Sequence, residues 1–119
     1  MARPLVIVGT GNYWHSLVKP SLKALQEANI VSDVVSVDIK EDLISERHVV
    51  RQPGQLLSKI VDALGLNNPF VMLAHPNHLH APEARELLEN STCEPSVIIE
   101  KPYANLLPGY HIHRWRQPL

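Results

Sequence analysis

The chain has 119 residues, of which 45% are hydrophobic and 19% are charged, and its formal net charge is −1 at pH 7. This composition fits a single globular domain rather than a disordered chain, and it gives no reason to expect binding to nucleic acid or to an anionic membrane. No apolar run reaches the roughly 18–20 residues that span a bilayer, and the N-terminus does not resemble a signal peptide. A single cysteine, Cys93, cannot form an intramolecular disulfide, so we expect a cytoplasmic protein.

Short apolar runs typical of buried strands alternate along the chain with segments that repeat apolar residues at helical spacing. In chain order we predict a strand at Leu5–Val8, a helix across 17–25, strands at Val34–Val37 and Val49–Val50, a helix across 56–64, a strand at Phe70–Ala74, a helix across 82–90 and a strand at Val97–Ile99. Alternation of this kind predicts a parallel sheet that is covered on both faces.

The predicted helices each have an apolar face. The first contains Pro20 in its early turns, and its apolar residues are Leu17, Val18, Leu22 and Leu25. The second is stopped by Gly65, and its apolar residues are Leu56, Leu57, Ile60, Val61 and Leu64. The third has Pro82 in its first turn and ends near Asn90, and its inward-facing residues are Ala84, Leu87 and Leu88.

These elements predict a three-layer, Rossmann-like α/β fold with about five parallel strands in the order 3-2-1-4-5. We expect residues 1–105 to form this domain and residues 106–119 to form a C-terminal tail. Ligands of such sheets bind at the carboxyl ends of the strands. Four polar or glycine-containing segments follow predicted strands there: Gly9–Gly11, Asp38, His75–Asn77 and Glu100–Pro102.

The pair Gly9 and Gly11 follows a strand and precedes a helix, which is the context that a dinucleotide-binding turn requires. Trp14 occupies the position of the third glycine, where an indole would crowd a pyrophosphate, and tight turns also use glycine for steric reasons alone. Asp38 suits the hydroxyls of an adenosine ribose and favours NAD over NADP, a preference that Lys40 weakens. The alternative for Asp38 is a solvated aspartate at a strand end.

Two further groups of residues have alternative interpretations. His75, His78 and His80 could supply zinc ligands, but no carboxylate or thiolate lies close to them in the sequence. Because two of them flank a helix start, where their directions diverge, we expect no metal site. Lys101, at the end of the last strand, could orient a substrate hydroxyl, or it could be a solvated lysine beside Glu100.

The motifs GTG, AHPNHLHA and VIIEKPYA occur in this order, and together they resemble the Gfo/Idh/MocA oxidoreductases, the family of glucose–fructose oxidoreductase and inositol dehydrogenase. The resemblance covers about residues 4–105. It implies a Rossmann domain for NAD or NADP, with Lys101 as the catalytic lysine beside the substrate. The cofactor-binding residues that it implies are Gly9, Thr10, Gly11, Asn12, Tyr13, Asp38, His75, Pro76, Asn77, His80 and Glu100.

In that family a second domain follows the E-K-P motif and supplies the substrate pocket and a general-base histidine, whereas this chain ends at Leu119. We therefore expect a truncated dinucleotide-binding domain that binds NAD or NADP weakly, or has lost them, and that does not catalyse a reaction alone. One alternative is an oxidoreductase completed by a partner chain. Another is an interaction or regulatory module that kept the fold without the cofactor. We also expect a homodimer formed through the tail.

Overall fold

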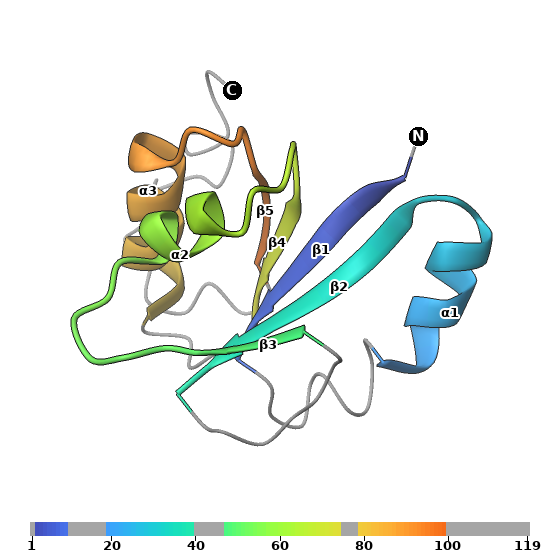
Figure 1. The fold of residues 1–119 in the computed structure, drawn as a ribbon, viewed down its shortest axis with the longest axis horizontal. Coiled ribbons are helices and arrows are strands. Elements are labelled where there is room, and N and C mark those ends of the chain that lie inside the picture. Colours follow the sequence, from blue (N-terminus) through green and yellow to red (C-terminus); the bar gives the residue numbers. More distant parts are fainter. Residues whose placement is uncertain (1, 10–18, 40–46, 75–78, 100–119) are drawn as a thin grey trace, which may run out of the picture.

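The computed structural model describes residues 2–9, 19–39, 47–74 and 79–99, which form one parallel sheet and three helices (Figure 1). The strands are β1 (Arg3–Val8), β2 (Val31–Asp38), β3 (Arg47–Val50), β4 (Phe70–Leu73) and β5 (Ser96–Ile99). The helices are α1 (Lys19–Glu27), α2 (Leu57–Ala63) and α3 (His80–Asn90). The strand order is β3-β2-β1-β4-β5, and all neighbours are parallel. The Rossmann-like α/β fold and the strand order predicted from the sequence are confirmed.

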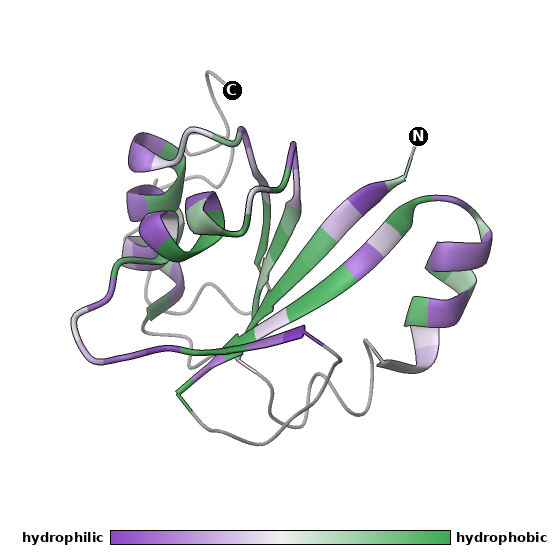
Figure 2. Ribbon diagram, viewed as in Figure 1, coloured by the Kyte–Doolittle hydropathy of each residue, from purple (hydrophilic) through white to green (hydrophobic). Residues whose placement is uncertain are grey.

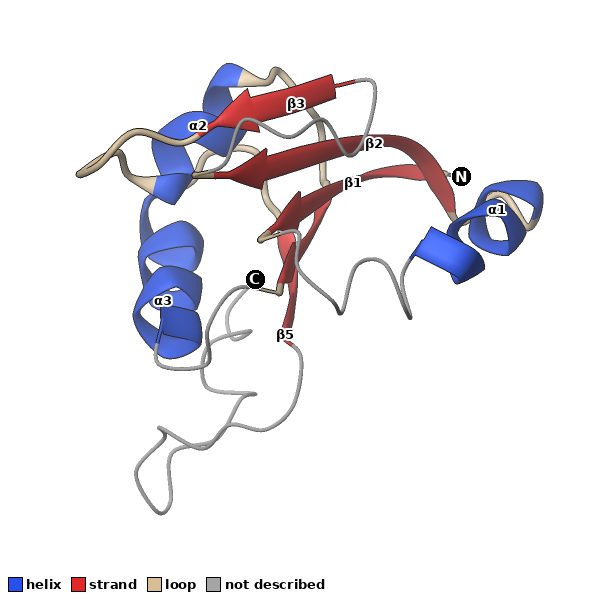
Figure 3. Cartoon of the chain, turned by 90° about the horizontal axis from the view of Figure 1, so that it is seen from below, coloured by secondary structure: helices blue, strands red, loops and turns tan. Residues whose placement is uncertain are grey.

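The helices lie in two layers, with α2 and α3 on one side of the sheet and α1 on the other (Figure 3). Alternate side chains of a strand point to opposite faces, and in β1 this alternation divides the core. Val6 and Val8 pack in the cluster that includes α2 and α3, whereas Leu5 and Ile7 pack in the cluster that α1 contacts. Because both faces are covered there, β1 is apolar at consecutive positions.

The ribbon coloured by hydropathy follows the same division (Figure 2). Strands β4 and β5 and most of β1 are hydrophobic, and β2 and β3 also carry hydrophilic positions, while α2 and α3 are hydrophobic toward the sheet and hydrophilic on their outer sides. The buried residues of these helices recur at helical spacing, as an amphipathic helix requires. The buried hydrophobic residues are Leu57, Ile60 and Val61 in α2 and Ala84 and Leu87 in α3, and the polar Ser58 and His80 are buried with them.

Helix α2 begins one residue later than its apolar pattern predicts. Leu56 is the N-cap residue and is 49% exposed, so it does not belong to the buried face of the helix. At the other end, Gly65 has φ 69° and follows the C-cap Leu64. Glycine adopts this left-handed conformation without steric strain, so the predicted end of the helix at Gly65 is confirmed.

Proline stands in the first turn of both α1 and α3. Pro20 is the second residue of α1, and Pro82 is the third residue of α3. The first amides of a helix have no partner within it, so a residue without an N–H is tolerated there. Strand β2 begins at Val31, three residues before the predicted start. Its register against β1 shifts between Arg3 and Leu5, on either side of a proline that cannot donate to the ladder.

Across the described ranges, none of the helices is both long and apolar enough to cross a membrane.

Candidate functional site

The carboxyl ends of four strands meet at one edge of the sheet, and backbone hydrogen bonds connect the residues there. The amide of Gly9 donates to the carbonyl of Val37 at 2.8 Å, and the amide of Arg51 donates to the carbonyl of Asp38 at 2.7 Å. The amide of Ala74 donates to the carbonyl of Val8, also at 2.7 Å. The edge therefore brings Gly9 and Asp38, two of the residues predicted from the sequence, to neighbouring strand ends.

Gly9 follows the last residue of β1 directly. Its φ is 87°, a conformation that side-chain-bearing residues rarely adopt. It is buried, and its amide already donates to β2. Gly9 therefore shapes the start of the turn, while any amides that face a bound phosphate would have to come from residues that follow it.

Asp38 is the last residue of β2, and it is partly buried. Its Oδ1 accepts a hydrogen bond from the amide of Ile39 at 2.6 Å. This contact fixes the carboxylate at the turn that leaves the strand, where aspartate commonly binds its own backbone. Ile39 itself is 73% exposed, so an exposed aliphatic side chain stands directly beside a fixed carboxylate.

A cavity of about 420 Å³ opens at Ile39, the residue that follows Asp38, between the ends of β2 and β3 and the first turns of α2 and α3. Its apolar lining includes Ile39 and Leu56, which are among the few large hydrophobic side chains that are exposed in the described ranges. The full lining is Ile39, Arg51, Gln52, Pro53, Gly54, Gln55, Leu56, Leu79, Pro82, Glu83 and Glu86. Apolar walls with a few fixed polar groups are typical of sites for small organic ligands.

An ion pair between Arg51 and Glu83 lies at this cavity. Nη1 of Arg51 donates to Oε1 of Glu83 at 2.6 Å, and Nη2 donates to Oε2 at 3.1 Å. The two side chains are 17% and 15% exposed. Nε and Nη2 also donate to the carbonyl of Gln55 at 3.0 and 2.9 Å. The guanidinium therefore ties the segment after β3 to the first turn of α3.

Glu86, one turn further along α3, fixes the start of α2. Its carboxylate accepts hydrogen bonds from the amide and the hydroxyl of Ser58, which is 1% exposed. The N-cap residue Leu56 has no side chain that could satisfy the first amides of α2. Glu86 takes over that role from the neighbouring helix, and thereby fixes the wall of the cavity.

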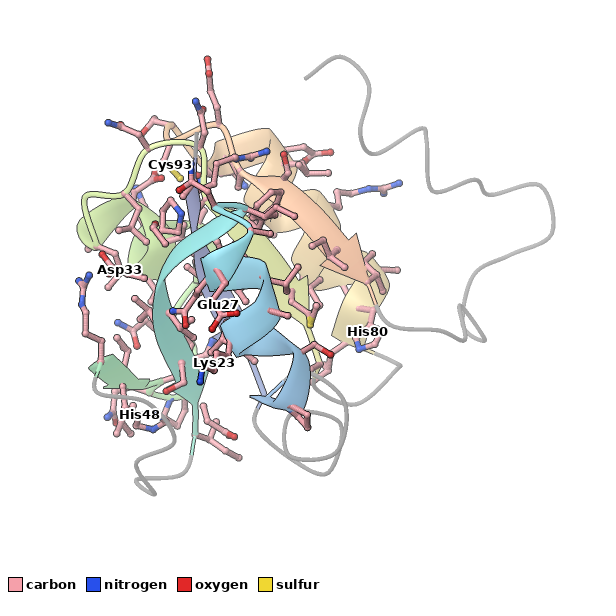
Figure 4. All side chains as sticks on the ribbon, turned by 90° about the vertical axis from the view of Figure 1, so that its right-hand side faces the viewer. Lys23, Glu27, Asp33, His48, His80 and Cys93 are labelled. Atoms are coloured by element: carbon pink, nitrogen blue, oxygen red, sulfur yellow. The ribbon has the colours of Figure 1, made fainter. Side chains whose placement is uncertain are left out.

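His80 is the first residue of α3 and is 2% exposed. It is not among the residues that line the cavity. In the view of Figure 4 it lies at the lower right of the described part of the chain, away from Cys93 at the upper left. Its predicted contact with a cofactor stays a prediction. The other predicted site residues lie outside the described ranges: Thr10, Gly11, Asn12, Tyr13, His75, Pro76, Asn77, Glu100 and Lys101.

Sequence reasoning missed the charged part of the site. Arg51 follows the third predicted strand directly, just as Asp38 follows the second predicted strand, although in the structure Asp38 is the last residue of β2 and Arg51 the first after β3. That position was the available signal, because residues after parallel strands share one edge. Glu83 and Glu86 stand on the helix that follows β4, and only the packing of α3 beside α2 brings them to the cavity.

A second cavity, of about 510 Å³, lies at the opposite edge of the sheet and includes Arg3 in its lining. The guanidinium of Arg3 lies 4.1 Å from the ring centroid of Phe70. Its Nε donates to the carbonyl of Asn68 at 2.5 Å, and Nη2 donates to the hydroxyl of Ser96 at 2.7 Å. These contacts hold the starts of β1, β4 and β5 together. Ligands of parallel sheets bind at the other edge, so the first cavity is the candidate site.

Within the described ranges no group of three or more histidine, cysteine, aspartate or glutamate side chains is arranged to hold a metal ion. Comparison of the chain with protein families, with curated proteins and with solved structures found no match.

Proposed function

We propose that the protein is a dinucleotide-binding domain of the oxidoreductase type, which binds NAD or NADP along the carboxyl edge of its sheet. The observation that carries the proposal is the cavity lined by Ile39, the neighbour of Asp38, with apolar walls and fixed charges. It lies beyond the ends of β2 and β3, on the side of the β1/β4 switch point where α/β sheets place the adenosine half of such ligands.

The chemistry of the cavity suits an adenosine. A purine base is flat and largely apolar, and the exposed side chains of Ile39 and Leu56 offer it apolar surface. The ribose carries two neighbouring hydroxyls, which both donate to a carboxylate. Asp38 is held next to Ile39, which lines the cavity, so the base would be held by apolar contact and the ribose by charge-assisted hydrogen bonds.

The remaining parts of the ligand would extend toward residues outside the described ranges. The left-handed turn at Gly9 is compatible with a chain that passes close to a pyrophosphate. The nicotinamide, when bound, would exchange a hydride with a substrate. Lys101 is the residue that the resemblance implies beside that substrate, and this role is part of the proposal.

Calorimetric titration of the purified chain with NADH, NADPH and ADP-ribose tests the proposal. Replacing Asp38 by alanine should weaken the binding of NADH and ADP-ribose by about tenfold or more, because charge-assisted hydrogen bonds to the ribose are lost. Asp33→Ala is the matched control, since Asp33 is an exposed aspartate near the other end of the same strand. We expect the control to bind like the wild type.

The proposal fails if none of the three ligands binds at millimolar concentration. It also fails if Asp38→Ala and Asp33→Ala bind them equally well, since the ligand would then lie elsewhere. ADP-ribose separates the two halves of the site, because it has the adenosine and the pyrophosphate without the nicotinamide.

A further inference from the structure

The backbone of Arg51 lies beside the proposed ribose site. It is the first residue after β3, and its amide donates to the carbonyl of Asp38 at 2.7 Å. NADP differs from NAD by a phosphate on the 2′ oxygen of the ribose, next to the position that Asp38 would contact. A guanidinium is the side chain best suited to bind such a phosphate. From its backbone position, Arg51 is therefore the residue expected to favour NADP.

The guanidinium of Arg51, however, is bound to Glu83 of α3. Both terminal nitrogens donate to the carboxylate of Glu83, at 2.6 and 3.1 Å. Two further hydrogen bonds to the carbonyl of Gln55 fix its orientation. The exposed fractions of 17% and 15% mean that water screens this pair weakly. Moving Arg51 toward a ligand would leave the carboxylate of Glu83 partly buried without its main partner, which is unfavourable.

We propose that Glu83 sets the preference of the site for NAD(H) over NADP(H). The inference rests on the proposed function. Glu83 is a positioning residue: it cancels the charge of Arg51 and holds the guanidinium against α3, so that Asp38 determines which ribose is accepted. A 2′-phosphate then meets the carboxylate of Asp38 without a compensating cation from Arg51, whereas a 2′-hydroxyl donates to that carboxylate.

The ratio of the Kd values for NADPH and NADH, measured by calorimetry on the full chain, tests the inference. In Glu83→Gln the charge of Arg51 is no longer cancelled, and the ratio should fall about tenfold, the value of one charge-assisted hydrogen bond. Glu83→Ala is measured beside it with the same expectation, and circular dichroism checks that both variants are folded. In the double variant Glu83→Gln, Arg51→Ala the ratio should return toward the wild-type value.

Glu89→Gln is the matched control. Glu89 is an exposed glutamate on the same helix, paired with Arg85 at 3.9 Å, and it does not line the cavity. This variant should keep the wild-type ratio within about twofold, because its charge is screened by water. A purely structural role for Glu83 would weaken both dinucleotides equally and leave the ratio unchanged.

The outcomes distinguish the two proposals. If the wild type binds neither dinucleotide, the proposed function fails, and this inference fails with it. If the wild type binds NADH but the Glu83 variants keep its ratio, or if the double variant keeps the ratio of Glu83→Gln, the assignment of Glu83 is wrong while the proposed function stands.

Discussion

Helices α2 and α3 bury aliphatic side chains against one face of the sheet, whereas α1 covers the other face with leucines that are only partly buried. Leu57 and Leu87 are 0% exposed in the first layer. In α1, Leu22 and Leu25 are the residues that pack against the sheet, and the remaining described side chains of that helix are exposed. The two layers therefore differ in how much apolar surface they remove from water, which is the main source of their attachment.

The α2/α3 layer also has the polar contacts that join separate elements, whereas the ion pair of α1 lies within that helix. Glu86 of α3 binds Ser58 at the start of α2, and Asp62 of α2 binds the turn that follows α3. The ion pair on α1, Lys23 with Glu27, joins neighbours on one helix at 4.0 Å and is 86% and 69% exposed (Figure 4). Exposed pairs of this kind contribute about 0–1 kcal/mol. Contacts between elements are thus concentrated in the α2/α3 layer.

The difference between the two helix layers matters for the candidate site, because only one of them forms the wall of the cavity. The cavity wall is built from the first turns of α2 and α3 and from the segment that Arg51 ties to them. A ligand pocket needs walls that keep their geometry, and here the walls belong to the layer with the larger core and the longer-range hydrogen bonds. The comparison predicts that substitutions in the α2/α3 layer affect both stability and binding more than equivalent substitutions in α1.

The largest effect should come from Leu87→Ala. This side chain is 0% exposed in α3, and truncation of a buried leucine lowers the free energy of unfolding by about 2–5 kcal/mol. Leu25→Ala in α1 is the matched comparison, since Leu25 is only partly buried, and it should cost less than half as much. Urea denaturation followed by far-UV circular dichroism measures both. Equal losses for the two variants would show that the layers are equally attached.

Glu86→Ala should have the next largest effect. Without the carboxylate, the amide and hydroxyl of the buried Ser58 lose their partner, which costs about 1–3 kcal/mol in the free energy of unfolding. Glu89→Ala removes an exposed glutamate from the same helix and should change this free energy by no more than about 0.5 kcal/mol. If Glu86→Ala falls within that same range, the contact between α3 and α2 is not a stabilising one.

The fold could be predicted because local pattern and global topology agree in this sequence. Leu5–Val8 and Val97–Ile99 are apolar runs too short for helices, and the spacing across residues 57–61 fits only a helix. Given these elements, the rules for parallel connections leave few strand orders. The ends of the elements depend on contacts that the local pattern does not contain. Leu56 fits the apolar pattern of α2 but is the N-cap residue, because Glu86 fixes the start of the helix one residue later.

The candidate site could be predicted only in part. Gly9 follows β1 directly and Asp38 is the last residue of β2, so their place at the carboxyl edge follows from the topology alone. The pairing of Arg51 with Glu83 spans 32 positions and depends on how α3 packs beside α2. No local pattern specifies such a contact, since charged residues on a helix are most often solvated. The arrangement of charges at the cavity, on which the proposed ligand preference depends, could therefore be seen only in the structure.

The smallest effect concerns the pH dependence contributed by Asp62, the residue of α2 that binds the turn after α3. Burial alone would raise its pKa, but hydrogen bonds from the hydroxyl of Ser91, at 2.7 Å, and from the amide of Thr92, at 3.1 Å, outweigh burial and lower the pKa below its ordinary value.

A pKa that is lower in the folded state than in the unfolded state means that the ionised carboxylate stabilises the fold. This contribution is complete above the unfolded pKa of about 4, and it is lost as the pH falls through the folded pKa.

Asp62→Asn should therefore lower the free energy of unfolding at pH 7, and the difference from the wild type should narrow as the pH falls below about 4. Because Asp62 is partly exposed, water screens its charge and the effect is smaller than that of Glu86→Ala. Urea denaturation between pH 7 and pH 3 measures it, with Asp33→Asn as the control for loss of an exposed carboxylate. A difference that stays constant over this range would show that the hydrogen bonds to Asp62 do not depend on its charge.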